Sequence, residues 1–138
     1  HAGPAGHGIV LKLINNFMSI SNCAIIAEAA TTAAKMGVDM SKFHAVISAG
    51  GANSKMFQMV APWLLEGDDS HLKGPLRIAG KDLRFYNKLA EQAQVASFIG
   101  QAVNQWLQLC NARGHGERYL PVLPGILAEL NGTKIRDL

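Results

Sequence analysis

The chain has 138 residues, the size of about one ordinary domain, of which 49% are apolar and 17% charged. This composition excludes a disordered chain and leaves fewer charges than the roughly 25% typical of soluble domains, so we expect some apolar surface to face a partner. The formal charge of +3 comes from 13 basic and 10 acidic residues spread along the chain. Because there is no basic run of the kind that binds phosphate backbones, we expect no nucleic-acid partner.

Cysteine and histidine spacing argues against a disulfide or a metal site. The two cysteines, Cys23 and Cys110, fit no disulfide or zinc pattern, so we predict free buried thiols in a reducing compartment, the cytoplasm. The five histidines form no i, i+4 pair and have no carboxylate at ligand spacing, so we predict no metal site. No signal peptide is visible, and polar residues interrupt the longest apolar stretch, near residues 9–30, so we predict no membrane span.

The apolar residues follow helical spacing over nearly the whole chain, without clear strand alternation. The first helix is expected to begin after the glycines at positions 3, 6 and 8 and to end near Met36, where Gly37 supplies a stop. At 1.5 Å per residue this helix is about 43 Å long. That length suggests a central or bridging helix.

Shorter helices are expected to follow, bounded by capping residues and by Gly or Pro. The second begins near Asp39 or Ser41, and Pro62 is expected to bend or split the end of the third. The expected ranges for the second to the last helix are 39–49, 53–65, 80–96, 97–111 and 121–130. The sequence therefore predicts an all-α bundle of five to seven helices with short connections and a long first helix.

A narrow polar stripe follows one side of the first predicted helix, whose other sides are apolar. Its members recur at steps of three or four residues: Lys12, Asn15 or Asn16, Ser19 and Asn22. A lysine on an otherwise buried helix lies in a low-dielectric place that disfavours its charged form and suits it to proton transfer. Asn16, one turn later, would bond both that amine and a bound oxygen. The alternative is that Lys12 reaches solvent while the asparagines bond the backbone.

Glycines at positions 3, 6 and 8 precede this helix in the order G-x-x-G-x-G. This order is the reverse of the dinucleotide fingerprint, and no strand precedes it, so the segment is not a Rossmann turn. Gly8 and its neighbours would let the backbone approach a ligand closely, or would form a flexible entry to the helix.

These positions together resemble a known enzyme family. The block Gly3-x-x-Gly6-x-Gly8-x-x-x-Lys12-x-x-Asn15-Asn16, with Ala27-Glu28-Ala29 and Gly80-Lys81-Asp82-Leu83, is similar to the C-terminal domain of the 3-hydroxyisobutyrate dehydrogenase, or β-hydroxyacid dehydrogenase, family. The resemblance implies the all-α fold of the C-terminal domain of 6-phosphogluconate dehydrogenase-like enzymes. Residues 1–138 would form a single catalytic and dimerisation domain, and the N-terminal Rossmann domain that binds NAD or NADP would be missing from this chain.

The resemblance also implies roles for individual residues. Lys12 would be the general acid/base, Asn16 would hold the substrate oxygen, Gly8 would approach the substrate, and Lys81 would reach the cofactor. Hydride transfer between nicotinamide and an alcohol carbon requires the hydroxyl proton to leave or return, which a lysine can perform. The implied substrate is a small β-hydroxyacid or semialdehyde such as 3-hydroxyisobutyrate. Without the resemblance, Lys81 fits a solvated lysine at a helix start equally well.

The sequence departs from related patterns at two positions. Asn15 stands where 6-phosphogluconate dehydrogenases have a second histidine, so the β-hydroxyacid branch fits better. Glu117 follows a glycine-rich turn where the family has an aspartate, and whether it takes that role stays open. Phe85 and Tyr86, beside Lys81, are expected to pack in the core; the alternative is that they reach the active-site cleft.

A second hypothesis is a non-catalytic helical dimerisation module. Low charge and abundant apolar residues favour it, and we expect a homo-oligomer under either hypothesis. Under the enzyme hypothesis the chain alone is expected to be inactive and to bind dinucleotide poorly, because it encodes no βαβ unit.

Overall fold

The computed structural model describes residues 5–138, so His1 and Gly3 lie outside the described residues. Within this range the chain forms six α-helices and one short 3-10 helix and has no strand. The elements are α1 (His7–Lys35), α2 (Met40–Ala49), α3 (Lys55–Glu66), α4 (Leu76–Gln92), α5 (Phe98–Ala112), η1 (Leu120–Val122) and α6 (Leu123–Leu130). The predicted all-α fold with a long first helix is confirmed.

The first helix ends at the predicted Gly37 and the second is capped by the predicted Asp39, whereas the cap of the third is Ser54, one residue after the predicted start at 53. Gly37 follows α1 with a φ of 78°, the left-handed conformation that favours glycine. The Asp39 carboxylate accepts a hydrogen bond from the backbone N of Ser41 at 2.7 Å and caps α2. The Ser54 hydroxyl accepts one from the backbone N of Phe57 at 3.0 Å and caps α3.

The predicted course of the next helices was partly wrong. α3 continues through Pro62 to Glu66 and is not split. α4 begins at Leu76, earlier than the predicted start at Gly80, because the extended Pro75 is itself the N-cap residue. Its end at Gln92 also precedes the predicted one, and Gln94 in the following turn has a φ of 58°.

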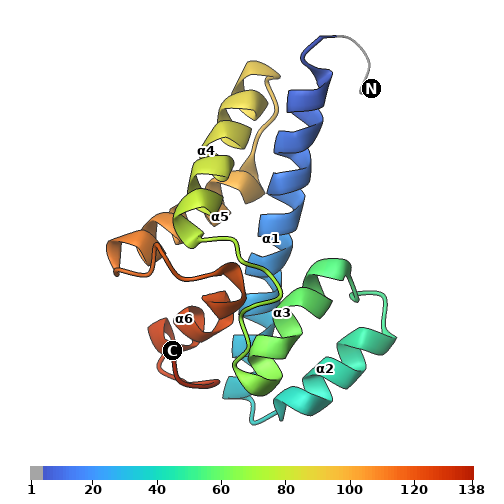
Figure 1. The fold of residues 1–138 in the computed structure, drawn as a ribbon, viewed down its shortest axis with the longest axis vertical. Coiled ribbons are helices and arrows are strands. Elements are labelled where there is room, and N and C mark those ends of the chain that lie inside the picture. The colour runs from blue at the N-terminus through green and yellow to red at the C-terminus, as the bar shows by residue number, and fades with distance from the viewer. Residues whose placement is uncertain (1–4) are drawn as a thin grey trace. The chain divides into compact units, whose positions relative to one another are not determined.

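The described residues form two compact units, and α1 contributes to both. The first unit comprises residues 5–21 and Pro75–Glu117. In it α4 lies beside the first half of α1, runs in the opposite direction and pairs with α5 (Figure 1). The apolar side chains buried in this unit come mainly from α4 and α5: Leu76, Ala79, Leu83, Val103, Leu107 and Cys110.

Gly100 lies where α5 meets α4 in the first unit. A Cβ atom at this position would approach the Tyr86 ring to 3.1 Å and would also collide with the Asn87 side-chain oxygen. The Asn87 Nδ2 donates a hydrogen bond to the Gly100 carbonyl at 3.1 Å. The missing side chain therefore permits the close contact of the two helices.

The second unit comprises Asn22–Gly74 and Arg118–Leu138 and contains the second half of α1, α2, α3, η1 and α6. In α2, Phe43 and His44 pack on the ring of Phe57 from α3, with ring centroids 5.9 and 5.8 Å apart. The core side chains of this unit are Cys23, Ala27 and Ala30 of α1, Phe57, Val60 and Leu64 of α3, and Val122, Leu123 and Ile126 of η1 and α6.

Both cysteines are free and buried, as predicted. Burial raises the pKa of the Cys23 thiol from 9.0 to about 12. Burial likewise raises the pKa of the Cys110 thiol to about 11. Both thiols are therefore protonated at neutral pH.

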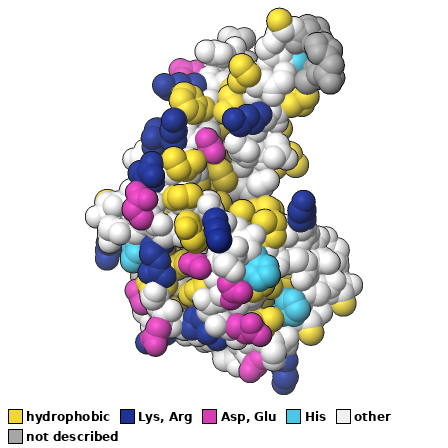
Figure 2. Space-filling model, in the orientation of Figure 1, with side chains coloured by type: hydrophobic (Ala, Val, Ile, Leu, Met, Phe, Trp, Pro, Cys, Tyr) yellow, Lys and Arg dark blue, Asp and Glu magenta, His cyan; other side chains and the backbone are white. Residues whose placement is uncertain are grey.

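α1 is less buried than its apolar composition suggests. Ile9, Leu11 and Met18 are 68%, 55% and 63% exposed, and further hydrophobic side chains reach the surface over α4 (Figure 2). By length and composition α1 could cross a membrane, a test that core helices of soluble proteins also pass. The absence of a membrane span therefore stays a prediction.

Candidate active site on α1 and α4

Two contacts in the first unit bring the polar stripe of α1 to the middle of α4. The Asn16 Nδ2 donates a hydrogen bond to the Asp82 Oδ2 at 3.4 Å, a long and therefore weak bond. Beside it, the rings of Phe17 and Tyr86 stack with centroids 3.8 Å apart and planes at 5°. Asn16 thus lies next to the Lys-Asp-Leu segment that contains Lys81.

Lys12 lies one turn before Asn16 on α1, and its side chain is exposed. The expectation of a lysine in a low-dielectric, buried place was therefore wrong for this chain. The reason is that Ile9 and Leu11, on the apolar sides of the same turns, are themselves exposed. Of the two interpretations, the solvent-reaching lysine matches the structure, although Asn16 bonds a carboxylate and not the backbone.

The glycines before Lys12 lie at the start of α1. Gly6 has a φ of 92°, and its carbonyl accepts a hydrogen bond from the backbone N of Val10 at 3.1 Å. Gly8 is exposed in the first turn, so the backbone there is open to solvent. Gly3 lies outside the described residues.

Lys81 is exposed on α4 and places its Nζ 5.9 Å from the centroid of the Phe85 ring. Phe85 is 45% exposed, so the expectation that it packs in the core was wrong. Tyr86, its neighbour, is half-buried by its stack on Phe17. Adjacent residues of a helix point in different directions, which is why one of the two rings is covered and the other is largely open.

Glu117 has a partner within the first unit. The Arg77 Nε donates a hydrogen bond to the Glu117 Oε1 at 2.7 Å, and the backbone N of Arg77 donates to the Gly116 carbonyl at 2.8 Å. The hydrogen bond and then the charge of Arg77 hold the pKa of the Glu117 carboxyl below its ordinary value. The glycine-rich turn is thereby attached to the first turn of α4.

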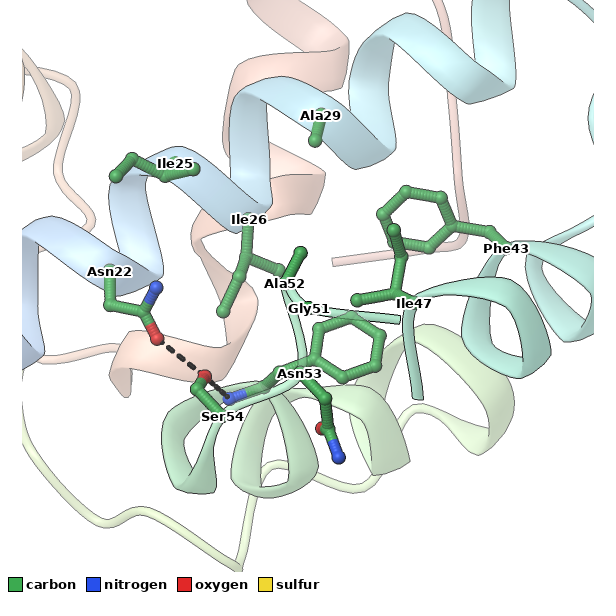
Figure 3. A pocket seen from close by; sticks show the side chains of 11 residues that line it. Asn22, Ile25, Ile26, Ala29, Phe43, Ile47, Gly51, Ala52, Asn53 and Ser54 are labelled. Carbon is green, nitrogen blue, oxygen red and sulfur yellow. Dashed lines mark hydrogen bonds between the residues drawn. The ribbon is translucent and has the colours of Figure 1, made fainter. Parts of the chain in front are cut away.

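A cavity of about 360 Å³ lies in the second unit, between α1, α2 and α3 (Figure 3). At its polar end the Ser54 hydroxyl donates a hydrogen bond to the Asn22 Oδ1 at 2.7 Å. Its apolar lining includes Ile25, Ile26, Phe43, Ile47 and Phe57. Asn22, the last member of the polar stripe, is thus bonded within the second unit. In the described part of the chain, His, Cys, Asp and Glu side chains form no group of three that could hold a metal ion.

Comparison with known proteins connects this arrangement to a family. The family model described as NAD-binding of NADP-dependent 3-hydroxyisobutyrate dehydrogenase matches residues 6–119. The chain belongs to this family. The family resemblance predicted from the glycine, lysine and asparagine positions is therefore confirmed, and the match supports NAD or NADP as the family's cofactor.

Three curated relatives have similar sequences. The chain is 29% identical to L-threonate dehydrogenase of Cupriavidus necator over 88% of its own length and 42% of the relative's. It is 30% identical to 3-sulfolactaldehyde reductase of Escherichia coli, over 86% and 40% of the two chains. For glyoxylate/succinic semialdehyde reductase 2 of Arabidopsis thaliana the identity is 27%, over 83% and 32%. The chain thus spans about two fifths or less of the length of these relatives.

A solved structure shows the same fold. The crystal structure of 3-hydroxyisobutyrate dehydrogenase from Salmonella typhimurium matches with a TM-score of 0.81 at 21% identity, over 88% of this chain and 42% of that one. At this identity the likeness establishes the all-α fold of the family, and it does not identify a substrate.

Proposed function

We propose that this chain is the all-α catalytic and dimerisation domain of an NAD(P)-dependent oxidoreductase. The enzyme would transfer a hydride between nicotinamide and a small β-hydroxyacid or semialdehyde, of which 3-hydroxyisobutyrate is one example. The observation that supports this most directly is the Asn16 to Asp82 hydrogen bond, because it sets the polar stripe of α1 beside Lys81. The relatives are named for threonate, sulfolactaldehyde, and glyoxylate or succinic semialdehyde, which favours a small, acidic substrate.

The residues of the site suit an alcohol or aldehyde oxygen and an anionic cofactor. Lys12 would accept the hydroxyl proton during oxidation and return it during reduction. The Asn16 amide has two N–H donors, so one remains for the substrate oxygen when the other bonds Asp82. The exposed backbone at Gly8 would approach the substrate, and Lys81 would contact the cofactor. When bound, NAD or NADP supplies the hydride-accepting or hydride-donating ring.

Exclusion of water around Lys12 would favour proton transfer near neutral pH, because a low dielectric disfavours the charged amine. The exposed Ile9 and Leu11 offer an apolar surface in the same turns of α1. We propose that an N-terminal nucleotide-binding domain closes over this surface in the complete enzyme. Such closure would supply the low-dielectric surroundings that this chain alone does not provide. The free, buried thiols further support a cytoplasmic enzyme.

The test is Lys12→Ala in an enzyme that joins this segment to a nucleotide-binding domain of the family. Loss of a general acid/base is expected to lower kcat by about 100-fold or more. The matched control is Lys42→Ala, an exposed lysine on α2, which is expected to leave kcat unchanged. Circular dichroism would establish that both variants are folded. Turnover near the normal rate in Lys12→Ala would remove Lys12 from the role of acid/base.

The second candidate, a non-catalytic dimerisation module, is favoured by the exposed apolar side chains of α1. Ile9, Met18 and Ile25 are each more than half exposed. Both candidates predict self-association, so sedimentation at tens of micromolar is expected to show a homo-oligomer. A monomer under these conditions would contradict the dimerisation role in either form.

A further inference from the structure

The cavity of the second unit has the size of a small-molecule site. Its volume is about 360 Å³, within the range of roughly 300–1,000 Å³ that is typical of ligand pockets. An apolar cavity of roughly 150 Å³ already holds a benzene molecule, so this one has room for an aromatic ring with a short substituent. All of its lining residues belong to the second unit, so one compact unit holds the whole cavity.

One hydrogen-bond donor is open at the polar end of the cavity. Figure 3 shows the Asn22 side chain directed from α1 toward Ser54. The Ser54 hydroxyl donates to the Asn22 Oδ1 at 2.7 Å and accepts from the backbone N of Phe57 at 3.0 Å. The side-chain hydrogen bonds of the described residues include none from the Asn22 Nδ2, and this nitrogen is accessible. A ligand atom that accepts a hydrogen bond can therefore bind to it.

The apolar end of the cavity is formed by α2, in which no side chain is fully buried. Phe43 and Ile47 of this helix line the cavity and are half-buried. The rings of Phe43 and His44 pack on Phe57 of α3. On the side of α1, Ile25 lines the cavity and is 61% exposed. A ligand between α1 and α2 would cover these apolar side chains, and such burial favours binding.

The lining of the cavity favours a neutral ligand. All eleven residues that line it in the described part of the chain are uncharged. A carboxylate or phosphate placed there would lose hydration without gaining an opposite charge, which costs free energy. The open donor belongs to a neutral amide, which suits a carbonyl oxygen. These features distinguish the ligand from the acidic substrates for which the relatives are named and from a cofactor that contains phosphate.

We propose that the cavity of the second unit binds a small, neutral, mainly apolar molecule that has one carbonyl group. The carbonyl oxygen accepts a hydrogen bond from the Asn22 Nδ2. The apolar part of the molecule lies between Ile25 of α1 and Phe43 and Ile47 of α2. The bound molecule attaches α2 more firmly to α1. This inference does not rest on the proposed function, because Lys12 lies in the other compact unit.

The experiment is a nuclear magnetic resonance titration of the chain with para-ethylbenzamide, which combines an apolar ring and a neutral carbonyl group. A ligand of this size binds weakly, so millimolar probe is expected to shift the backbone amide signals of α2 and of the lining residues on α1 and α3. The anion para-ethylbenzoate has nearly the same shape and is expected to bind about tenfold more weakly. Because the N-terminus of α3 favours a negative charge, equal or tighter binding of the benzoate would overturn the assignment of a neutral ligand.

Asn22→Asp keeps the oxygen that accepts from Ser54 and removes the N–H donor. This variant is expected to weaken binding of para-ethylbenzamide by about tenfold, the loss of one hydrogen bond. The matched control is Asn53→Asp, because the Asn53 Oδ1 accepts a hydrogen bond from the Gln58 Nε2 at 2.9 Å and its side chain points away from Asn22 (Figure 3). Binding to the control is expected to be unchanged, and equal weakening in the two variants would overturn the contact with Asn22.

A second pair of variants tests whether the probe occupies the cavity itself. Ala29→Leu enlarges an exposed lining residue of α1 and is expected to block binding, whereas Ala45→Leu makes the same change on α2 outside the lining and is expected to leave it unchanged. Circular dichroism would establish that each variant is folded. The proposal is overturned if Ala29→Leu binds the probe normally or if the shifts occur on other elements. Lining signals that move on dilution of the free chain would show a second copy in the cavity and would also overturn it.

Discussion

Replacing Gly100 with alanine is expected to loosen the contact between α5 and α4, because a methyl group there has no room. It would approach the Tyr86 ring to 3.1 Å and collide with the Asn87 amide oxygen. Overpacking of this kind costs about 1–3 kcal/mol. Asn87 is 7% exposed, and loss of its 3.1 Å bond to the Gly100 carbonyl would leave a buried donor unpaired, at about 1–3 kcal/mol.

The better helix propensity of alanine opposes these costs by at most about 1 kcal/mol. We therefore expect Gly100→Ala to lower the free energy of unfolding by about 2–3 kcal/mol. In a chain of this size the Tm should fall by about 10 °C. Urea unfolding followed by circular dichroism measures the first quantity, and a thermal scan measures the second.

Gly51→Ala is the matched control, because Gly51 is exposed and a Cβ there would meet no atom within 4 Å. Its free energy of unfolding is expected to stay within about 0.5 kcal/mol of the unmodified chain. A Gly100→Ala variant inside the same margin would refute the close α4 to α5 contact. Displacement of Tyr86 from Phe17 should also change the near-ultraviolet circular dichroism of Gly100→Ala.

Further predictions concern a helix cap and the thiols. Ser54→Ala is expected to cost about 1–2 kcal/mol by removing the cap of α3 and the hydrogen bond to Asn22. Ser97→Ala, at a helix start without a side-chain cap bond, should cost almost nothing, and equal losses would contradict the capping role. Cys23 and Cys110 should resist alkylation in the folded chain and react after unfolding; rapid labelling of the folded chain would show that the thiols are accessible. Burial raises the pKa of the Cys23 thiol from 9.0 to about 12 in the folded chain, so the thiol of the unfolded chain ionises at lower pH. The free energy of unfolding should therefore fall as pH rises from 9 toward 12. Below pH 9 this thiol should cause no change in stability. Cys23→Ala should flatten that fall, and an unchanged slope would assign it to other groups.

The helix ends with capping residues were predictable because a cap is a local interaction. Asp39 accepts a hydrogen bond from the backbone N of Ser41, two residues later, and Gly37 adopts a left-handed conformation that favours glycine. The start of α4 was missed because Pro75 can end one segment or begin the next. Its role depends on the residues that Leu76 packs against, which local spacing does not reveal.

The candidate site likewise has features that the sequence predicted and features that it did not. The spacing of Lys12 and Asn16 places them on one side of a helix, whatever surrounds it. The contact of Asn16 with Asp82 joins residues 66 positions apart, and periodicity carries no information about such pairs. The burial of Lys12 was predicted wrongly for a related reason. Apolar residues on one side of a helix indicate that this side packs against a partner, but they do not show whether that partner lies in the same chain. The exposure of Phe85 likewise depends on how α4 packs and not on its own sequence.

Each compact unit of this chain is assembled from two separate stretches, and the stretches of the two units alternate along the sequence. A contiguous segment that carries both stretches of the first unit therefore also carries residues 22–74 of the second. Recombination between genes cannot transfer the residues of the candidate site without also transferring the cavity of the second unit. We therefore expect the two units to be inherited together, as one contiguous segment of sequence.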